Sequence, residues 1–154
     1  SKPTKANQPV NKQYEFNGVT TLTDGLKGNG NYKTGRWIAF YRNDMDVIID
    51  LLEPTEISTV AFTACVEKGD WIFDARGVTI EISEDGENFT KVASEDYPAM
   101  KETDRNGLYE HKLAFDPVKA RYVRVIAPSE KSIPDWHGGK GLPGFLFVDE
   151  ITID

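Results

Sequence analysis

The chain has 154 residues, a length that fits one domain with a sizeable core. It carries 18 Lys and Arg against 25 Asp and Glu, a net charge of -7, which argues against binding to nucleic acid or to an anionic membrane surface. The single cysteine, Cys65, excludes an internal disulfide and a zinc site built on several thiolates. Because Cys65 lies in the apolar run VAFTACV, we expect a buried, inert thiol.

The first 13 residues, SKPTKANQPVNKQ, are polar and lack the pattern of the segments that follow. They predict a linker or a loosely attached lead-in over residues 1–13, followed by one domain over residues 14–154. Because the chain starts at Ser1, we expect a piece of a longer or processed protein. No apolar run reaches about 18 residues, and no signal-peptide pattern is present.

Six segments carry the alternation of apolar residues that is typical of half-buried strands. In chain order they are residues 45–52, 60–66, 77–83, 108–115, 120–127 and 145–153. The residues predicted to share an apolar face within their own segment are Val60, Phe62, Ala64 and Val66; Val78, Ile80 and Ile82; Tyr109, His111, Leu113 and Phe115; Val123 and Val125; and Phe145, Phe147, Ile151 and Ile153. The position of His111 among apolar neighbours favours a packed or hydrogen-bonded histidine.

Turn-forming residues separate these segments. Glu53-Pro54 and Asp116-Pro117 are predicted to break the chain between strands, and Asp85-Gly86 is a strong turn signal because glycine accepts a positive φ. No stretch keeps a helical period over about ten residues. Many short strands with turn-rich connections predict an all-β fold, a single-domain jelly-roll β-sandwich.

The motifs LTDGLKGNG, GRWIAF, VIIDLLEPTEISTVAF, SEDGENFTKV, ARYVRVIA and FLFVDEITI follow one another in this order. The ordered set resembles the discoidin domain, also called the coagulation factor V/VIII C-type domain, whose bacterial branch includes the family 32 carbohydrate-binding modules. The resemblance covers residues 14–154. Three segments, WIAFYRNDMDVIIDL, DWIFDARGVTIEISEDG and PDWHGGKGLPGFLFVDEI, resemble more narrowly a C-terminal module of bacterial chitobiases, the β-N-acetylhexosaminidases of glycoside hydrolase family 20.

This resemblance implies a non-catalytic module that binds glycans containing N-acetylglucosamine or galactose and positions the catalytic domain of its parent chain. It also implies an exported protein, either periplasmic, at the cell surface or secreted. One alternative is a purely structural module that packs on the catalytic barrel without a soluble ligand. A lipid-binding role fits least, because it requires apolar residues ringed by Lys and Arg.

Discoidin-like modules often hold a structural calcium ion beside an early Asp-Gly turn. The resemblance carries this site over to Asp24 in LTDG and Glu150 in VDEI, with the carbonyl of Leu22 and the hydroxyl or carbonyl of Thr34 as further ligands. Calcium takes hard oxygen ligands of these kinds. The segment LKGNGNYKTGR is longer and less acidic than the common pattern, and the alternative is that Asp24 only caps a turn.

A carbohydrate site needs an apolar plane for the ring and polar groups for the hydroxyls. The family places such a site on loops at one end of the sandwich, and three loops supply candidates. The candidate residues are Tyr41 and Arg42, then Asp70, Trp71 and Arg76, and finally Trp136 and His137. Trp136 can instead be a lid over the core with His137 satisfied by backbone carbonyls. Trp71, which begins the apolar stretch WIF, can equally belong to the core, and Trp37 is expected in the core.

No catalytic site is predicted. Asp135 and His137 could form an acid–base pair, but the sequence contains no Gly-x-Ser-x-Gly motif. Asp149 and Glu150 cannot act as the paired carboxylates of a glycosidase, because adjacent strand residues point to opposite faces.

Overall fold

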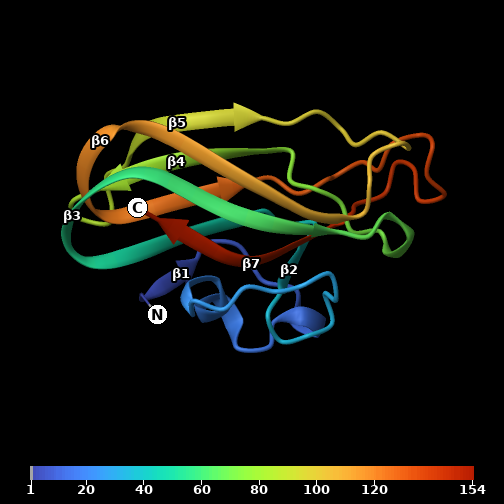
Figure 1. The fold of residues 1–154 in the computed structure, drawn as a ribbon, viewed down its shortest axis with the longest axis horizontal. Helices are drawn as coiled ribbons and strands as arrows, with labels where there is room; N and C mark the ends of the chain where they lie inside the picture. Colours follow the sequence, from blue (N-terminus) through green and yellow to red (C-terminus); the bar gives the residue numbers. More distant parts are fainter. Residues whose placement is uncertain (1) are drawn as a thin grey trace.

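The computed structural model describes residues 2–154 and consists mainly of antiparallel strands (Figure 1). The strands are β1 (Thr4–Ala6), β2 (Ile38–Tyr41), β3 (Met45–Val66), β4 (Gly77–Ser83), β5 (Thr90–Asp96), β6 (Gly107–Ala127) and β7 (Phe145–Ile153). The helices of the described residues are the short 3₁₀ helices η1 (Lys12–Tyr14), η2 (Gly18–Thr23) and η3 (Lys68–Asp70). Within residues 2–154, no helix has the length and apolar character needed to cross a membrane.

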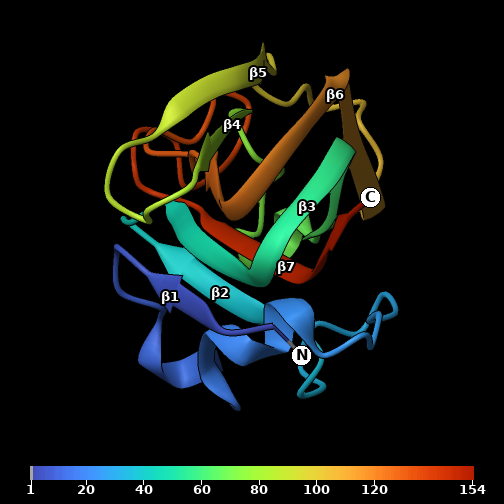
Figure 2. The same cartoon turned by 90° about the vertical axis from the view of Figure 1, so that its left-hand side faces the viewer.

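The strands pair in the order β2-β7-β3-β6-β4-β5, and β1 pairs with β3. The long strands β3 and β6 pair along most of their length and bend together, so that each contributes to two layers (Figure 2). The first part of β3 lies with β1, β4, β5 and the end of β6, whereas its second part lies with β2, β7 and the start of β6. The predicted all-β, jelly-roll-like sandwich is therefore confirmed.

The two predicted breaks at Glu53-Pro54 and Asp116-Pro117 are wrong as strand ends. Both dipeptides lie inside continuous strands, β3 and β6, at the bend where the pair passes from one layer to the other. The pairing shifts register on both sides of Thr55, and Leu52 adopts φ 76°. Proline has no N–H to donate, so it is tolerated where the hydrogen-bond ladder is interrupted.

The main core fills the space between the layers. It collects the alternating residues predicted from the sequence: Val60, Phe62 and Ala64 of β3 are almost fully buried, as are Val78 and Ile80 of β4. Leu113, Val123 and Val125 of β6 contribute as well. The period of two therefore identified which faces of these strands are internal.

Strand β7 departs from the predicted single face. Phe147 packs in an outer cluster, whereas Ile151 lies in the main core with Val148. Phe62 of β3 is opposite Ile151 and Ala64 is opposite Val148, so β7 holds one extra residue at Asp149-Glu150. Such a bulge reverses the alternation beyond it.

A second cluster, outside the main core, is built around Trp37 with Cys65, Ile72 and Phe147. The Trp37 side chain is fully buried, as expected, and its Nε1 donates to the carbonyl of Asn29 at 3.0 Å. Burial raises the pKa of the Cys65 thiol to about 11. The prediction of a buried cysteine is confirmed, and a raised thiol pKa is consistent with low reactivity.

The polar N-terminal segment is joined to the sheet. Residues 4–6, inside the predicted lead-in, form β1 and pair with residues 47–49 of β3. Asn7 adds two hydrogen bonds, from its backbone N to the Asp46 carbonyl at 2.7 Å and from Nδ2 to Asp46 Oδ1 at 3.0 Å. The attachment is closer than the composition suggested, because an edge strand needs only main-chain hydrogen bonds. Ser1 lies outside the described residues.

Candidate functional site

Two of the three loops predicted to carry a site, those between β3 and β4 and between β6 and β7, lie at one end of the sandwich, at the right of Figure 1. The third, the β2–β3 turn, is hydrogen-bonded to the start of the β6–β7 loop, where Ser129 contacts Asn43 and Asp44. The name loop end is used here for four segments. They are the loops that join β2 to β3, β3 to β4 and β6 to β7, and residues 97–106 between β5 and β6. Backbone hydrogen bonds connect them: Phe145 N donates to Trp71 O at 2.8 Å, and Arg76 N donates to Pro128 O at 2.8 Å. Tyr41 pairs with Phe145 across β2 and β7. The sandwich thus brings together residues that are far apart in the sequence.

Trp71 closes a tight turn after η3. Its φ of 64° is left-handed, and its backbone N donates to Lys68 O at 3.1 Å. The indole is half-buried and lies against Gly139, where an added Cβ would come within 2.9 Å of the ring. The neighbouring Asp70 is exposed and accepts a hydrogen bond from the Tyr32 hydroxyl at 2.8 Å. The same turn therefore carries an apolar ring and an exposed carboxylate at consecutive positions.

Trp136 and His137 have the contacts expected of a lid. Trp136 is half-buried beside Phe73, with its Nε1 donating to Met100 O at 3.0 Å. His137 Nε2 lies 2.7 Å from Lys68 O, and His137 Nδ1 accepts from the backbone N of Gly139 at 2.9 Å. Nε2 is therefore the protonated nitrogen. With both ring nitrogens engaged by the backbone, His137 cannot act as a base without rearrangement.

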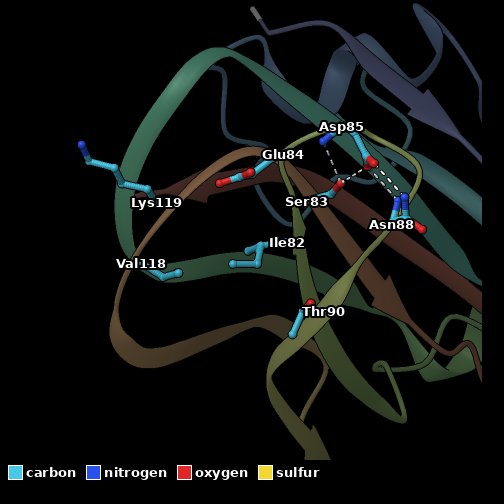
Figure 3. Close-up of a pocket in the computed structure, with 8 residues that line it drawn as sticks. All are labelled: Ile82, Ser83, Glu84, Asp85, Asn88, Thr90, Val118 and Lys119. Atoms are coloured by element: carbon cyan, nitrogen blue, oxygen red, sulfur yellow. Dashed lines mark hydrogen bonds between the residues drawn. The ribbon is translucent and has the colours of Figure 1, made fainter.

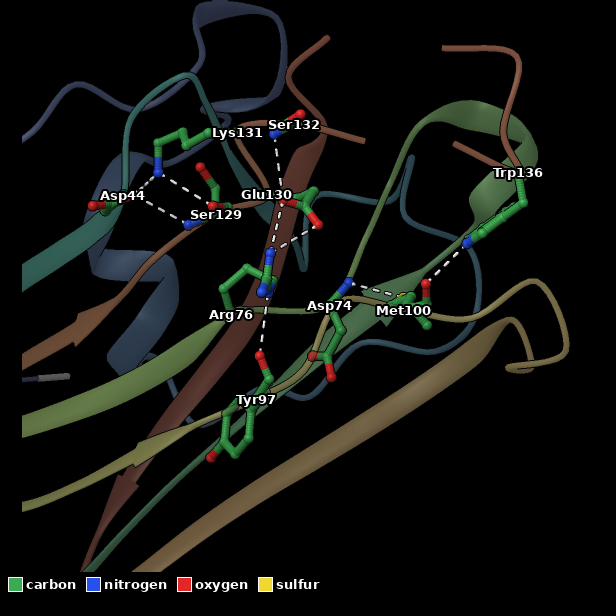
Figure 4. Close-up of polar contacts among 10 residues, drawn as sticks. All are labelled: Asp44, Asp74, Arg76, Tyr97, Met100, Ser129, Glu130, Lys131, Ser132 and Trp136. Atoms are coloured by element: carbon green, nitrogen blue, oxygen red, sulfur yellow. Dashed lines mark hydrogen bonds and ion pairs between the residues drawn. The ribbon is translucent and has the colours of Figure 1, made fainter. Parts of the chain in front are cut away.

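Arg76 pairs with a buried carboxylate (Figure 4). Its Nη1 lies 3.2 Å from both carboxylate oxygens of Glu130, whose side chain is only 3% exposed. Its Nε donates to the carbonyl of Tyr97 at 3.2 Å. Because a buried carboxylate needs a charged partner, these contacts give Arg76 a structural role between the β4 strand and the β6–β7 loop.

His111 is packed and hydrogen-bonded, as predicted. Its Nε2 lies 2.7 Å from Asp74 Oδ1, and its ring stacks on Tyr97 with centroids 4.2 Å apart. Desolvation by burial raises the pKa of Tyr97 to about 12. The contacts of His111 with Asp74 and Tyr97 connect β6 to the loop before β4. The imidazole therefore has hydrogen-bonding and stacking partners within the chain and needs none from a ligand.

Tyr41 and Arg42 lie at the β2–β3 turn. The guanidinium carbon of Arg42 is 5.4 Å from the centroid of the Tyr41 ring, and that ring packs on Phe145 with centroids 4.5 Å apart. The next residue but one, Asp44, forms an ion pair with Lys131. Tyr41 thus offers a half-buried ring and Arg42 an exposed cation, a combination that can contact the ring face and the hydroxyl groups of a sugar.

An aromatic chain connects Tyr41 to the neighbourhood of Trp71. Phe145 contacts Tyr14 with centroids 6.1 Å apart, and Tyr14 contacts Tyr32 at the same separation. The Tyr32 hydroxyl in turn donates a hydrogen bond to Asp70. Burial and this hydrogen bond raise the pKa of Tyr32 to about 12. Sequence reasoning missed Tyr32 because its segment, GNGNYKTG, was considered only for a metal. An aromatic residue within a polar Gly-rich loop was the available signal.

The residues predicted to bind calcium are partly brought together. The side chains of Asp24 and Glu150 interact, and the backbone N of Gly25 lies 3.1 and 3.2 Å from the two Glu150 oxygens. Leu22 is fully buried in η2, two residues before Asp24. The hydroxyl of Thr34 donates to the Asn31 carbonyl at 3.2 Å.

Glu150 is buried, where a negative charge is unfavourable. Burial, followed by the proximity of Asp24 and Asp149, raises the pKa of Glu150 to about 7. Two neighbouring acids with hard oxygen atoms fit a calcium ion, which would relieve their repulsion. Within residues 2–154 no group of three or more acidic, histidine or cysteine side chains is arranged for a metal, so calcium here would also take carbonyl oxygens.

The comparisons with known proteins agree with this architecture. The family described as the F5/8 type C domain matches residues 4–143. Among solved structures, the chain is similar to the CBM32 of AlyQ, with a TM-score of 0.58, 19% identity, and coverage of 99% of this chain and 93% of that one. No curated protein matches the chain.

Two further solved structures have the same fold. One is the module CpGH89CBM32-5 from Clostridium perfringens, with a TM-score of 0.59, 18% identity, and coverage of 99% of this chain and 93% of that one. The other is chitosan-binding module 1 of a chitosanase/glucanase from Paenibacillus sp. IK-5, with a TM-score of 0.58, 18% identity, and coverage of 99% and 94%. Each similarity extends over nearly the whole of both chains.

Proposed function

Because the chain belongs to the F5/8 type C domain family, we propose that it is a non-catalytic carbohydrate-binding module of an exported glycoside hydrolase. The similar structures support a sugar ligand: those proteins are described with 4,5-unsaturated mannuronic acid, with GalNAc-β-1,3-galactose and as chitosan-binding. The resemblance in sequence favours a β-N-acetylhexosaminidase, or chitobiase, as the parent enzyme.

The observation that carries this proposal is the aromatic chain of the loop end with polar groups at both extremities. Tyr41 has Arg42 beside its ring, and Trp71 follows Asp70, which is held by the Tyr32 hydroxyl. A pyranose ring is apolar on one face and hydroxylated at its rim, so it requires this combination. In contrast, Arg76, Trp136 and His137 have contacts that stabilise the loops.

A single weak site is useful when it is tethered to an enzyme. Once the module has bound a polymer, the linked catalytic domain meets the same polymer in an intramolecular step. The effective concentration of substrate at the catalytic domain is therefore raised. The module would thereby keep the catalytic domain, periplasmic, surface-bound or secreted, close to its glycan.

We predict that Trp71→Ala and Tyr41→Ala each weaken glycan binding by about tenfold or more, equivalent to about 1.4 kcal/mol. Loss of the ring removes the apolar contact with the sugar face. Isothermal calorimetry against oligomers containing N-acetylglucosamine or galactose measures the change. Leu52→Ala is the control, because Leu52 is 56% exposed at the bend of β3, on the opposite side of the sandwich from the loop end.

The alternative is a structural module that packs on the catalytic barrel. Trp71 and Trp136 are partly buried, which is one observation in favour of this structural role. No binding across a broad glycan panel at millimolar concentration, together with acrylamide quenching of tryptophan fluorescence that sugar does not change, would support this alternative. Trp37 is fully buried and supplies the unquenched reference population.

We also propose that Asp24 and Glu150, with the carbonyl of Leu22, hold calcium. The folded protein favours protonated Glu150, because its pKa is raised from 4.5 to about 7. This contribution to stability is therefore present below about pH 4.5 and is lost as the pH rises through about 7. Calcium would favour the ionised form and restore stability at the higher pH.

In the presence of chelator we expect the melting temperature to fall between about pH 5.5 and about pH 8, and millimolar calcium to raise it at the higher pH by about 3–10 °C. The calcium effect should be smaller at the lower pH. Glu150→Gln should remove both effects, whereas Glu53→Gln, a change at an exposed acid, should retain them. Equal melting temperatures with and without calcium at both pH values would reject the site.

A further inference from the structure

A hollow of about 470 Å³ lies at the end of the sandwich opposite to the loop end (Figure 3). It is here called the hairpin hollow, because it is bounded by the turn between β4 and β5 and by the bend of β6. The residues that matter for its chemistry are Ile82, Glu84, Asp85, Thr90, Val118 and Lys119. None of these residues belongs to the proposed glycan site or to the calcium site.

One wall of the hairpin hollow is held rigidly by its own turn. Asp85 Oδ1 accepts from the backbone N of Glu87 at 2.9 Å and of Asn88 at 2.8 Å, and Asp85 Oδ2 accepts from Asn88 Nδ2 at 2.7 Å. The Asn88 hydrogen bonds hold the pKa of Asp85 well below its usual range, so this carboxylate stays charged. Gly86, at φ 79°, lies against the Tyr122 ring. The wall therefore exists before any ligand arrives.

The floor is apolar and the rim has free polar groups. Ile82 and Val118 are half-buried and pack against the main core. Figure 3 shows Glu84 and Lys119 on one side of these two residues and Thr90 on the other. Among the described residues, the carboxylate of Glu84, the ammonium group of Lys119 and the hydroxyl of Thr90 have no hydrogen-bond or ion-pair partner within the chain.

This arrangement restricts the ligand. An aliphatic floor with polar groups around it suits a sugar ring, and the volume lies in the range of small-molecule sites. The hollow is lined by two carboxylates, Glu84 and Asp85, and by one ammonium group, that of Lys119. Figure 3 shows the Asp85 carboxylate directed toward Asn88, so Glu84 is the carboxylate left for a ligand, and the net negative charge of the lining favours a cation and opposes a uronic acid. A lysine side chain of a peptide would satisfy Glu84 but would leave Lys119 and Thr90 without partners.

We propose that the hairpin hollow is a second carbohydrate site, which takes an amino sugar with a free ammonium group. Glu84 pairs with that ammonium group, Thr90 and Lys119 contact ring hydroxyls, and the apolar ring face lies on Ile82 and Val118. Two sites at opposite ends of one module allow a polymer to be held at two points, or two chains to be bridged, which raises avidity.

The test is a titration of the whole chain with a glucosamine trisaccharide, followed by backbone amide NMR. We expect shifts at Ile82, Glu84, Thr90 and Val118 that saturate separately from any shifts at the loop end. Glu84→Gln should raise the Kd about tenfold, because a charge-assisted contact is lost. Glu87→Gln makes the same charge change in the same turn at a residue outside the hollow and should leave the Kd within about twofold.

Further probes separate this site from the loop end and from other ligands. Trp71→Ala should leave the shifts at the hairpin hollow unchanged, whether or not the loop end binds sugar. The N-acetylated trisaccharide and a galacturonic acid trisaccharide should bind here more weakly than the amine. Equal effects of the two glutamate substitutions, shifts confined to the loop end, or tighter binding of a trilysine peptide would overturn the proposal.

Discussion

Gly28→Ala is expected to lower the free energy of unfolding by about 3 kcal/mol, because the new methyl group has no space. A Cβ at this position would lie 2.2 Å from Nε1 and 2.3 Å from Cε2 of Trp37. The indole cannot move away easily, since it is fully buried and its Nε1 donates to the Asn29 carbonyl. The Gly28 backbone is also held, because its N donates to Asp149 Oδ2 at 2.8 Å.

Thermal and urea denaturation measure this change, and a loss of that size corresponds to about 6–12 °C in melting temperature. Gly30→Ala is the matched control in the same loop, because no atom lies within 4 Å of a Cβ there. It should change stability by no more than about 0.5 kcal/mol. Trp37→Phe in the Gly28→Ala background should restore part of the loss, since the smaller ring frees space. Equal stability of the two alanine variants would contradict the packing described for Trp37.

Arg76→Met is expected to destabilise the protein by about 2–3 kcal/mol, because it leaves the Glu130 carboxylate buried without a charged partner. The side chain of Glu130 is 3% exposed and that of Arg76 is 38% exposed. The expected loss is below that of a fully buried pair, because solvent reaches the guanidinium group. Methionine keeps the apolar stem, so the change tests the charge more than the packing.

The double variant Arg76→Met with Glu130→Gln should recover much of that stability, which a double-mutant cycle in urea measures. Arg121→Met is the control, because it breaks an exposed pair with Asp50, 41% and 20% exposed, and should cost less than about 1 kcal/mol. If Arg76→Met is as stable as the parent chain but loses glycan binding, Arg76 is a ligand residue and the structural role is wrong.

Two groups of polar residues now have distinct expected roles at the loop end. Arg76, Trp136 and His137 satisfy buried carboxylate and carbonyl groups within the chain. Tyr41 and Trp71, with Asp70, remain the proposed glycan contacts. Substitutions in the first group should therefore change stability first, and substitutions in the second should change affinity.

The sequence by itself determined the all-β class and, for most of the segments with a period of two, which face is internal. A period of two encodes the face of a strand directly, so the burial of Val60, Phe62 and Ala64 followed from their spacing. The buried Trp37 and the inert Cys65 followed from their apolar neighbours. The ordered motifs by themselves also indicate the discoidin-like family.

The tertiary structure decided how the strands bend and which residues meet. Pro54 and Pro117 lack a backbone N–H whether the chain ends a strand there or bends within one, so the local sequence does not separate the two cases. Only the pairing of β3 with β6 shows that both prolines lie in a bend. The extra residue in β7 is likewise defined only against its partner strand. Local patterns cannot encode these features, because register depends on residues distant in the chain.

The same reason explains the site residues that the sequence could not assign. Glu130 lies 54 residues from Arg76, and Tyr32 lies 38 residues from Asp70, so neither partner is visible in a local motif. A charged or aromatic side chain in a loop has the same composition whether it serves the fold or a ligand. The neighbours supplied by the folded sandwich, which neutralise some of these groups and leave others open to solvent, decide between the two roles.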